Sequence, residues 1–166
     1  MANAIGEEEK SSMLSFIESS NRFTNGPKVK EFERKWSEWM GINHSVFVNS
    51  GSSANALLLW AVKRRFFDPE DKEMVVLTPA CTWATNLATL QQFNIRFVVC
   101  DNDLWDFGFS EDTLKEVKMN YPDVNVIWAT HLMGSPVNMD LIDEYFPDAH
   151  IIEDCCESHG ADLNGK

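Results

Sequence analysis

The sequence predicts an α/β fold in which a mostly parallel sheet carries helices on both faces. Two patterns predict it. Short β-rich runs alternate with stretches whose apolar residues recur at helical spacing. The β-rich runs are apolar throughout, as in strands that are covered on both faces, instead of alternating between apolar and polar residues. The length of 166 residues and the hydrophobic share of 44% fit one such domain, or one large piece of a bigger one.

The chain begins with a polar segment followed by a helix. Residues 1–25 are rich in Ser, Glu and Asn and are expected to form an arm or a loose helix. From Pro27, apolar residues recur at helical spacing as far as Met40. Proline suits a first helical turn, and Gly41 suits the position just after a helix. A strand is expected over the β-rich run of residues 45–49, and the tight turn SGSSAN then leads into an apolar helix.

The rest of the chain continues this alternation. Strands are expected over residues 74–77, 95–100, 124–129 and 150–153. Helices are expected over residues 82–93, 112–119 and 139–146. Because ligands of parallel sheets bind beyond the carboxyl ends of the strands, the segments that follow the strands should carry the function. These segments are residues 50–55, 79–85, 131–134 and 154–159.

Composition and charge exclude several classes of function. Fourteen basic and 26 acidic side chains give a net charge of −12, which repels phosphate backbones and anionic lipids, so neither nucleic acid nor a membrane is an expected partner. The start of the chain has no signal-peptide pattern, and the longest apolar run, residues 56–62, is too short to span a bilayer. Four cysteines without the spacing of a disulfide framework fit a reducing cytoplasm.

The turn at residues 49–55 is the first candidate site. Its small residues let a ligand approach the backbone, and the start of a helix presents free N–H groups and the positive end of the helix dipole, so the turn could hold a phosphate. It lacks the Gly-Lys-Ser/Thr of a P-loop and the GxGxxG of a dinucleotide-binding turn. An ordinary serine N-cap after a glycine turn explains the same residues equally well.

Two further segments contain residues suited to ligand binding. Trp83, among small and hydroxylated neighbours, could stack on a planar ring, although a lone Trp near a helix start is more often part of a core. Asp154 directly follows an apolar strand, so its carboxylate either caps a loop or meets a cationic group of a ligand. A metal at Cys155, Cys156 and His159 is disfavoured because adjacent cysteines do not easily bind one ion and zinc spacings are missing.

Six blocks of the sequence, taken in order, resemble one family. They are TNGPKVKEFERKW, NSGSSANALLL, LTPACTWATNLATL, FVVCDND, HLMGSPVNMD and IIEDCCESHGADLNGK. Together they resemble the pyridoxal-phosphate (PLP) enzymes of the DegT/DnrJ/EryC1/StrS sugar aminotransferase group. The resemblance implies that residues 26–166 form an incomplete large domain of the fold-type-I aminotransferase architecture, and that the cofactor is PLP.

The resemblance also implies roles for individual residues. Ser52 and Ser53 match the family's phosphate-binding turn, and Trp83 resembles the aromatic residue that stacks on the pyridine ring. Asp154 resembles the aspartate that pairs with the ring nitrogen, where a carboxylate keeps this nitrogen protonated. Glu157 stands where the family often has Gln, near the ring hydroxyl.

The resemblance implies no catalytic residue within this chain. The family's lysine that binds PLP covalently lies beyond the aspartate motif, and the last residue here, Lys166, matches a loop position. The expected function is that of the amino-terminal part of an enzyme that moves an amino group from an amino acid to a nucleotide-linked keto sugar, together with a complementary chain or as a homo-oligomer. Two alternatives stay open. One is half of a dehydratase of the same family, in which histidine replaces the lysine, and the other is a non-catalytic binding or assembly module.

Overall fold

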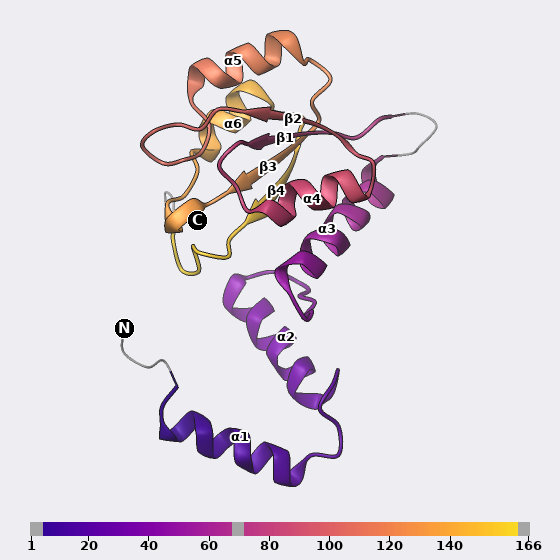
Figure 1. Ribbon diagram of the computed structural model, residues 1–166, viewed down its shortest axis with the longest axis vertical. Helices are drawn as coiled ribbons and strands as arrows, with labels where there is room; N and C mark the ends of the chain where they lie inside the picture. The colour runs from indigo at the N-terminus through magenta and orange to yellow at the C-terminus, as the bar shows by residue number, and fades with distance from the viewer. Residues whose placement is uncertain (1–4, 68–71, 163–166) are drawn as a thin grey trace. The chain divides into compact units, whose positions relative to one another are not determined.

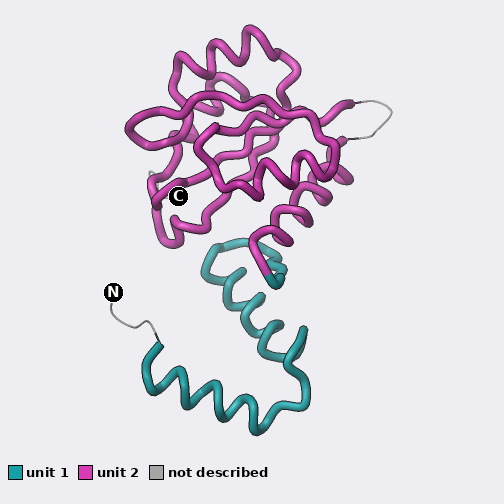
Figure 2. The backbone as a smooth tube through the Cα atoms, viewed as in Figure 1, with its two compact units in different colours: residues 1–49 teal, residues 50–166 magenta. Residues whose placement is uncertain are grey.

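The computed structural model describes residues 5–67 and 72–162 of the chain. The chain forms two compact units, residues 1–49 and residues 50–166 (Figure 2). Among the described residues, the first unit contains helices and the second contains a parallel sheet with helices. None of the described helices is long and apolar enough to cross a membrane. The expected start of the cofactor-binding domain at residue 26 stays a prediction.

The first unit contains the two helices α1 (Glu7–Ser19) and α2 (Pro27–Met40). α1 lies within the segment expected to be an arm or a loose helix, and none of its residues is buried. α2 begins at the proline, as predicted, and Gly41 caps its carboxyl end with a φ of 67°, the left-handed conformation that glycine adopts without strain. The rings of Phe32 and Trp36 stack one turn apart on α2, with centroids 5.6 Å apart.

The expected strand over residues 45–49 is wrong, because this segment pairs with no described strand. Its hydrogen bonds go to side chains of α2 instead. The backbone N–H of Phe47 donates to the Glu33 carboxylate at 3.0 Å, and the Ser45 hydroxyl lies 2.8 Å from the Ser37 hydroxyl. A β-rich run becomes a strand only where a second backbone completes its hydrogen bonds, and β propensity alone does not report whether that backbone is present.

The second unit is a four-stranded sheet with helices on both faces, which confirms the predicted α/β fold (Figure 1). The strands lie in the order β2-β1-β3-β4, and every neighbouring pair is parallel. The strands are β1 (Val75–Pro79), β2 (Arg96–Cys100), β3 (Val126–Thr130) and β4 (His150–Asp154). The helices are α3 (Gly51–Phe66), α4 (Ala84–Gln92), α5 (Glu111–Asn120) and α6 (Met139–Tyr145), with the short 3-10 helix η1 (Leu132–Gly134) after β3.

The side chains of the strands point alternately to the two faces of the sheet and form two core layers. One layer packs α5 and α6 against the sheet and includes Leu77 and Ile142. The other packs α3 and α4 against the opposite face and includes Leu59, Leu90 and Trp128. All five side chains are fully buried. Because both faces are covered, the two central strands β1 and β3 are buried along their whole length and are mostly apolar, and this is the pattern that predicted the fold.

Candidate functional site

The carboxyl ends of β1 and β3 lie side by side at the point where the strand order reverses. The connection after β1 leads to β2 on one side, and the connection after β3 leads to β4 on the other side. In open α/β sheets a crevice forms at such a switch point, and ligands bind there. Two hydroxyl groups at this edge of the sheet form a hydrogen bond between the segment after β1 and the end of β3: Thr82 Oγ1 lies 2.7 Å from Thr130 Oγ1. The candidate site is built around this point from the segments that follow the strands.

Asp154 is the last residue of β4, and hydrogen-bond donors hold both of its carboxylate oxygens. Oδ2 accepts a hydrogen bond from Asn86 Nδ2 at 3.0 Å, and Oδ1 accepts one from the backbone N–H of Cys156 at 3.2 Å. Hydrogen bonding to this carboxylate raises the pKa of the Cys156 thiol to about 11. Both donors to Asp154 are neutral, so they orient its negative charge without cancelling it. A carboxylate in this state is suited to a cationic group of a ligand.

Asn86, which the sequence did not single out, lies at the centre of this arrangement. It is fully buried in the first turn of α4. Its Oδ1 accepts a hydrogen bond from Asn55 Nδ2 at 2.7 Å, and its Nδ2 also donates to Thr82 Oγ1 at 2.9 Å and to Thr130 Oγ1 at 3.3 Å. The signal that could have identified Asn86 is its position on the helix face that packs against the sheet. A buried amide there must have hydrogen-bond partners.

The first turn of α3 contains the predicted phosphate-binding serines. Ser50 is the N-cap: its Oγ accepts a hydrogen bond from the Ser53 N–H and lies 3.2 Å from Ser53 Oγ. The ordinary N-cap interpretation therefore holds for Ser50 and Ser53. Gly51 and Ser52 are exposed, and a Cβ built on Gly51 would meet no atom of the described residues within 4 Å. Packing therefore does not require this glycine, and the space beside the first N–H groups of α3 is open to an anion.

Trp83 and Glu157 lie on segments that follow strands at the same edge of the sheet. Trp83 is the N-cap residue of α4 and is 68% exposed, so it is not part of the core. Glu157 Oε2 accepts a hydrogen bond from the backbone N–H of Met133. Next to it, a Cβ built on Gly134 would lie 3.0 Å from the Glu157 carbonyl oxygen. These contacts tie the segment after β4 to η1 and fix Glu157 beside the end of β3.

His131, at the end of β3, lies beside Glu153 and Cys155, and one ligand atom from each of these residues lies within 4.8 Å of the others. Three such groups can hold a metal ion, but His131 Nδ1 accepts a hydrogen bond from the Val137 N–H at 3.0 Å. The ring proton on Nε2 then faces Glu153 Oε1 at 3.1 Å, and hydrogen bonding to Cys155 and Glu153 raises the pKa of His131 to about 9. A protonated nitrogen cannot bind a metal. The hydrogen bonds favour a structural role, and the absence of a metal site stays a prediction.

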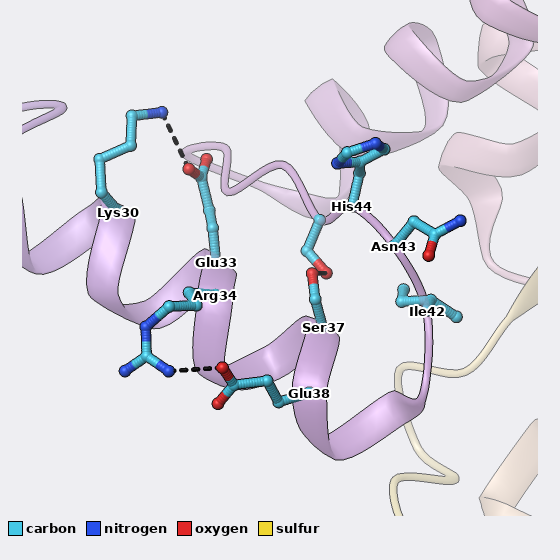
Figure 3. A pocket seen from close by; sticks show the side chains of 9 residues that line it. Lys30, Glu33, Arg34, Ser37, Glu38, Ile42, Asn43 and His44 are labelled. Atoms are coloured by element: carbon cyan, nitrogen blue, oxygen red, sulfur yellow. Dashed lines mark hydrogen bonds and ion pairs between the residues drawn. The ribbon is translucent and has the colours of Figure 1, made fainter.

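A shallow pocket of about 510 Å³ lies in the first unit, between α2 and the segment of residues 42–45 (Figure 3). The charged side chains that line it pair with one another. Lys30 Nζ lies 2.8 Å from the Glu33 carboxylate, and the Arg34 guanidinium lies 2.6 Å from the Glu38 carboxylate. Because each of these cations is already paired, the pocket offers no concentrated charge to a phosphate or a carboxylate. It is therefore a poor candidate for the cofactor site.

The second unit combines an open helix start, an exposed indole and an oriented carboxylate at one edge of a parallel sheet. These features define a cofactor-binding α/β domain. The sequence model of the DegT/DnrJ/EryC1/StrS aminotransferase family matches residues 4–166, and the chain belongs to this family. The family and its solved structures with bound PLP indicate dependence on this cofactor.

The chain is similar to enzymes that act on nucleotide-linked sugars. It is 36% identical over 173 residues to GDP-4-keto-6-deoxy-D-mannose 3-dehydratase of Yersinia pseudotuberculosis, a match that covers 100% of this chain and 42% of that protein. GDP-perosamine synthase of Caulobacter vibrioides is 29% identical over 153 residues, covering 91% of this chain and 38% of that protein. The chain thus spans about 40% of the length of these relatives.

A solved structure shows the same fold. The E. coli GDP-4-keto-6-deoxy-D-mannose-3-dehydratase with bound hydrated PLP superposes with a TM-score of 0.89 at 30% sequence identity. The match covers 99% of this chain and 42% of that chain. The expected architecture, a partial large domain of the fold-type-I PLP-dependent enzymes, is confirmed.

Proposed function

We propose that this chain supplies the cofactor-binding part of a PLP-dependent enzyme that acts on a nucleotide-linked sugar. The observation that carries the proposal is the Asp154 carboxylate, which two neutral donors orient at the carboxyl end of β4. When bound, PLP supplies a ring that withdraws electrons from a carbon attached to it, and it does so best when the ring nitrogen is protonated. Asp154 would hold the proton on that nitrogen, because a nearby anion favours the cationic form.

The other predicted residues fit the remaining parts of the cofactor. The phosphate would lie at the first turn of α3, where the N–H groups of Gly51 and Ser52 and the helix dipole favour an anion. Ser53 would contribute its hydroxyl group, because its N–H already donates to the N-cap serine. Trp83 would lie against the face of the ring. Glu157 would lie near the ring hydroxyl, where it places a carboxyl group in the position of the amide that the family often has.

For the reaction, the relatives favour dehydration over amino transfer. The dehydratase of Yersinia pseudotuberculosis is 36% identical over the whole chain, whereas GDP-perosamine synthase is 29% identical over 91% of it. We therefore propose 3-dehydration of a nucleotide-linked keto sugar as the reaction of the complete enzyme. Amino transfer from an amino acid to the keto carbon, which the sequence resemblance implied, is the second candidate.

The complete enzyme would need a complementary part, because the chain spans 42% of the dehydratase that it matches. We propose that this part, on a complementary chain or a longer form of this one, carries the lysine or histidine that faces the cofactor. The substrates would be the nucleotide-linked sugar and an amino-acid donor. A homo-oligomer is the other assembly that the family resemblance implies.

A product analysis tests the proposed reaction. The chain and its complementary part are incubated with PLP, 15N-labelled glutamate and GDP-4-keto-6-deoxy-D-mannose, and the sugar products are identified by mass spectrometry. A product that lacks the C3 hydroxyl group and contains no 15N supports dehydration, whereas 15N in the sugar supports amino transfer. If neither product forms and PLP does not bind, the chain is a non-catalytic module and the proposal is wrong.

A further inference from the structure

We propose that Asn86 is a positioning residue that sets the separation between Asp154 and the phosphate-binding turn of α3. This inference rests on the proposed PLP site. The side chain of Asn86 connects the two regions: it accepts a hydrogen bond from Asn55 at 2.7 Å and donates one to Asp154 at 3.0 Å. The three residues come from α3, α4 and β4, which meet at one face of the sheet (Figure 1).

The hydrogen bonds allow only one orientation of the Asn86 amide. In the observed orientation, its oxygen faces a donor, Asn55 Nδ2, and its nitrogen faces an acceptor, Asp154 Oδ2. A flip of the amide would place two donors together at Asn55 and two acceptors together at Asp154. Asn86 is fully buried, so water cannot relieve such a conflict. The amide therefore keeps its positive end on the Asp154 carboxylate.

Two threonines hold Asn86 in this orientation. Its Nδ2 faces three acceptors, Asp154 Oδ2, Thr82 Oγ1 at 2.9 Å and Thr130 Oγ1 at 3.3 Å. Because the amide nitrogen has only two hydrogens, two of these acceptors share one hydrogen. The two hydroxyl groups also lie 2.7 Å from each other. The network thus joins Asp154 to the segment after β1 and to the end of β3, and the partners named here, two threonines and two asparagines, are neutral.

The position of Asn55 explains why this network would matter for a cofactor. Asn55 is one turn along α3 from Gly51 and Ser52, so a side chain that fixes Asn55 also fixes the open turn. PLP has its phosphate and its ring nitrogen at separate places on one rigid ring. A site that binds the phosphate and the ring nitrogen at once needs a fixed separation between the first turn of α3 and the Asp154 carboxylate. If this separation changes, PLP binds more weakly and the carboxylate stabilises the protonated ring nitrogen less well.

The variant Asn86→Leu tests the proposal, because leucine keeps the branching and the number of side-chain heavy atoms and loses all four hydrogen bonds of the amide, to Asn55, Thr82, Thr130 and Asp154. Thr89→Val is the matched control: Thr89 is buried in the same helix, and its hydroxyl donates only to the Thr85 carbonyl in the described contacts, at 2.6 Å. The readouts are the affinity of the chain for PLP and the 15N chemical shift of ring-labelled PLP, which reports the proton on the ring nitrogen. We expect Asn86→Leu to weaken PLP binding about tenfold or more and to shift the 15N signal toward the unprotonated ring. Thr89→Val should change neither.

A second variant covers the case in which Asn86→Leu does not fold. Asn55→Ala removes the half-buried end of the network, and it should weaken PLP binding several-fold while the chain keeps its cooperative melting. If either folded variant binds PLP as the wild type does, with the same 15N shift, the positioning role is wrong and the cofactor site stands. If the wild-type chain, alone and with its complementary part, does not bind PLP, the proposed function fails first and the positioning role fails with it.

Discussion

A Cβ built on Gly134 would lie 3.0 Å from the carbonyl oxygen of Glu157, closer than side-chain atoms normally approach a backbone oxygen. Gly134 also has a φ of 83°, in the left-handed region that favours glycine. The short 3-10 helix after β3 and the segment after β4 are thus packed together without space for a side chain. This contact, with the hydrogen bond from Met133, holds Glu157 at the edge of the candidate site.

The first prediction is that Gly134→Ala destabilises the protein by roughly 1–3 kcal/mol, because it adds backbone strain to a steric clash. Gly160→Ala is the control, since Gly160 has a φ of 82° but a Cβ there would meet no described atom within 4 Å. The control should cost only the backbone strain, about 1 kcal/mol. Urea unfolding of both variants measures the difference. Equal losses would show that the approach to Glu157 is not important.

The second prediction separates binding from folding at Gly51. Gly51→Ala should leave the melting temperature unchanged or slightly higher, because alanine favours a helix and its Cβ meets no described atom. The same Cβ would occupy the open space beside the first N–H groups of α3, so PLP should bind several-fold more weakly. Thermal melting and a PLP titration followed by Trp fluorescence measure the two effects. Unchanged PLP binding would argue against a phosphate at this turn.

The third prediction concerns pH and the Glu153 carboxylate. A hydrogen bond from the His131 ring lowers the pKa of Glu153 below its usual value of about 4.5. A carboxyl group whose pKa is lowered on folding stabilises the protein above the unfolded pKa, and this contribution is lost as the pH falls through the folded pKa. Because Glu153 is about half exposed, we expect a contribution below about 1 kcal/mol.

The variant Glu153→Gln should therefore lose stability at pH 7 but change less than the wild type between about pH 5 and pH 3. Glu116→Gln, which removes one exposed carboxylate from α5, is the control for the loss of a charge. Urea unfolding across this pH range measures both. Parallel pH profiles for the wild type and Glu153→Gln would show that the pair with His131 contributes nothing.

The secondary structure of the second unit could be predicted because each of its elements has a local signal. The strands contain short apolar runs, such as residues 75–77 in β1, and the helices have caps, such as Ser110 before α5. Residues 45–49 have the same β-rich signal without a strand, because a strand also needs a partner backbone, which no local pattern reports.

The candidate site could be predicted in part, because some of its residues also have a local signal in the sequence. Asp154 ends an apolar strand and Ser52 lies in a glycine-serine turn at the start of a helix, and both positions are readable in a sequence. Asn86 belongs to the site through partners that are 31 and 68 residues away, Asn55 and Asp154. Hydrogen bonds over such separations depend on the strand order, which the sequence alone did not specify.

The fourth prediction is that PLP attaches covalently to no particular lysine of this chain. The family resemblance implies that none of the nine lysines takes the position of the family's covalent lysine. Borohydride reduction in the presence of PLP, followed by peptide mapping, should find low labelling spread over exposed lysines such as Lys28 and Lys115. One lysine labelled in full would contradict the assignment of the covalent residue to the complementary part.

The fifth prediction is that Asp154→Asn and Trp83→Ala damage the complete enzyme in different ways. Asparagine keeps the size of Asp154 but loses the negative charge that would hold the ring nitrogen protonated. Turnover should fall about 100-fold or more, the size of effect seen when one charge-stabilising group is removed from an active site. PLP should still bind, because the first turn of α3 is unchanged.

Trp83→Ala should instead weaken PLP retention about fivefold, because an aromatic stacking contact contributes on the order of 1 kcal/mol, and its effect on turnover at saturating PLP should be small. Trp83 is 68% exposed, so its loss should leave the melting temperature nearly unchanged, which separates a binding role from a folding role. Turnover is measured on the chain combined with its complementary part, and PLP retention by equilibrium dialysis. If Asp154→Asn leaves turnover unchanged, Asp154 does not face the ring nitrogen, and the proposed orientation of the cofactor at the carboxyl ends of β1 and β3 is wrong.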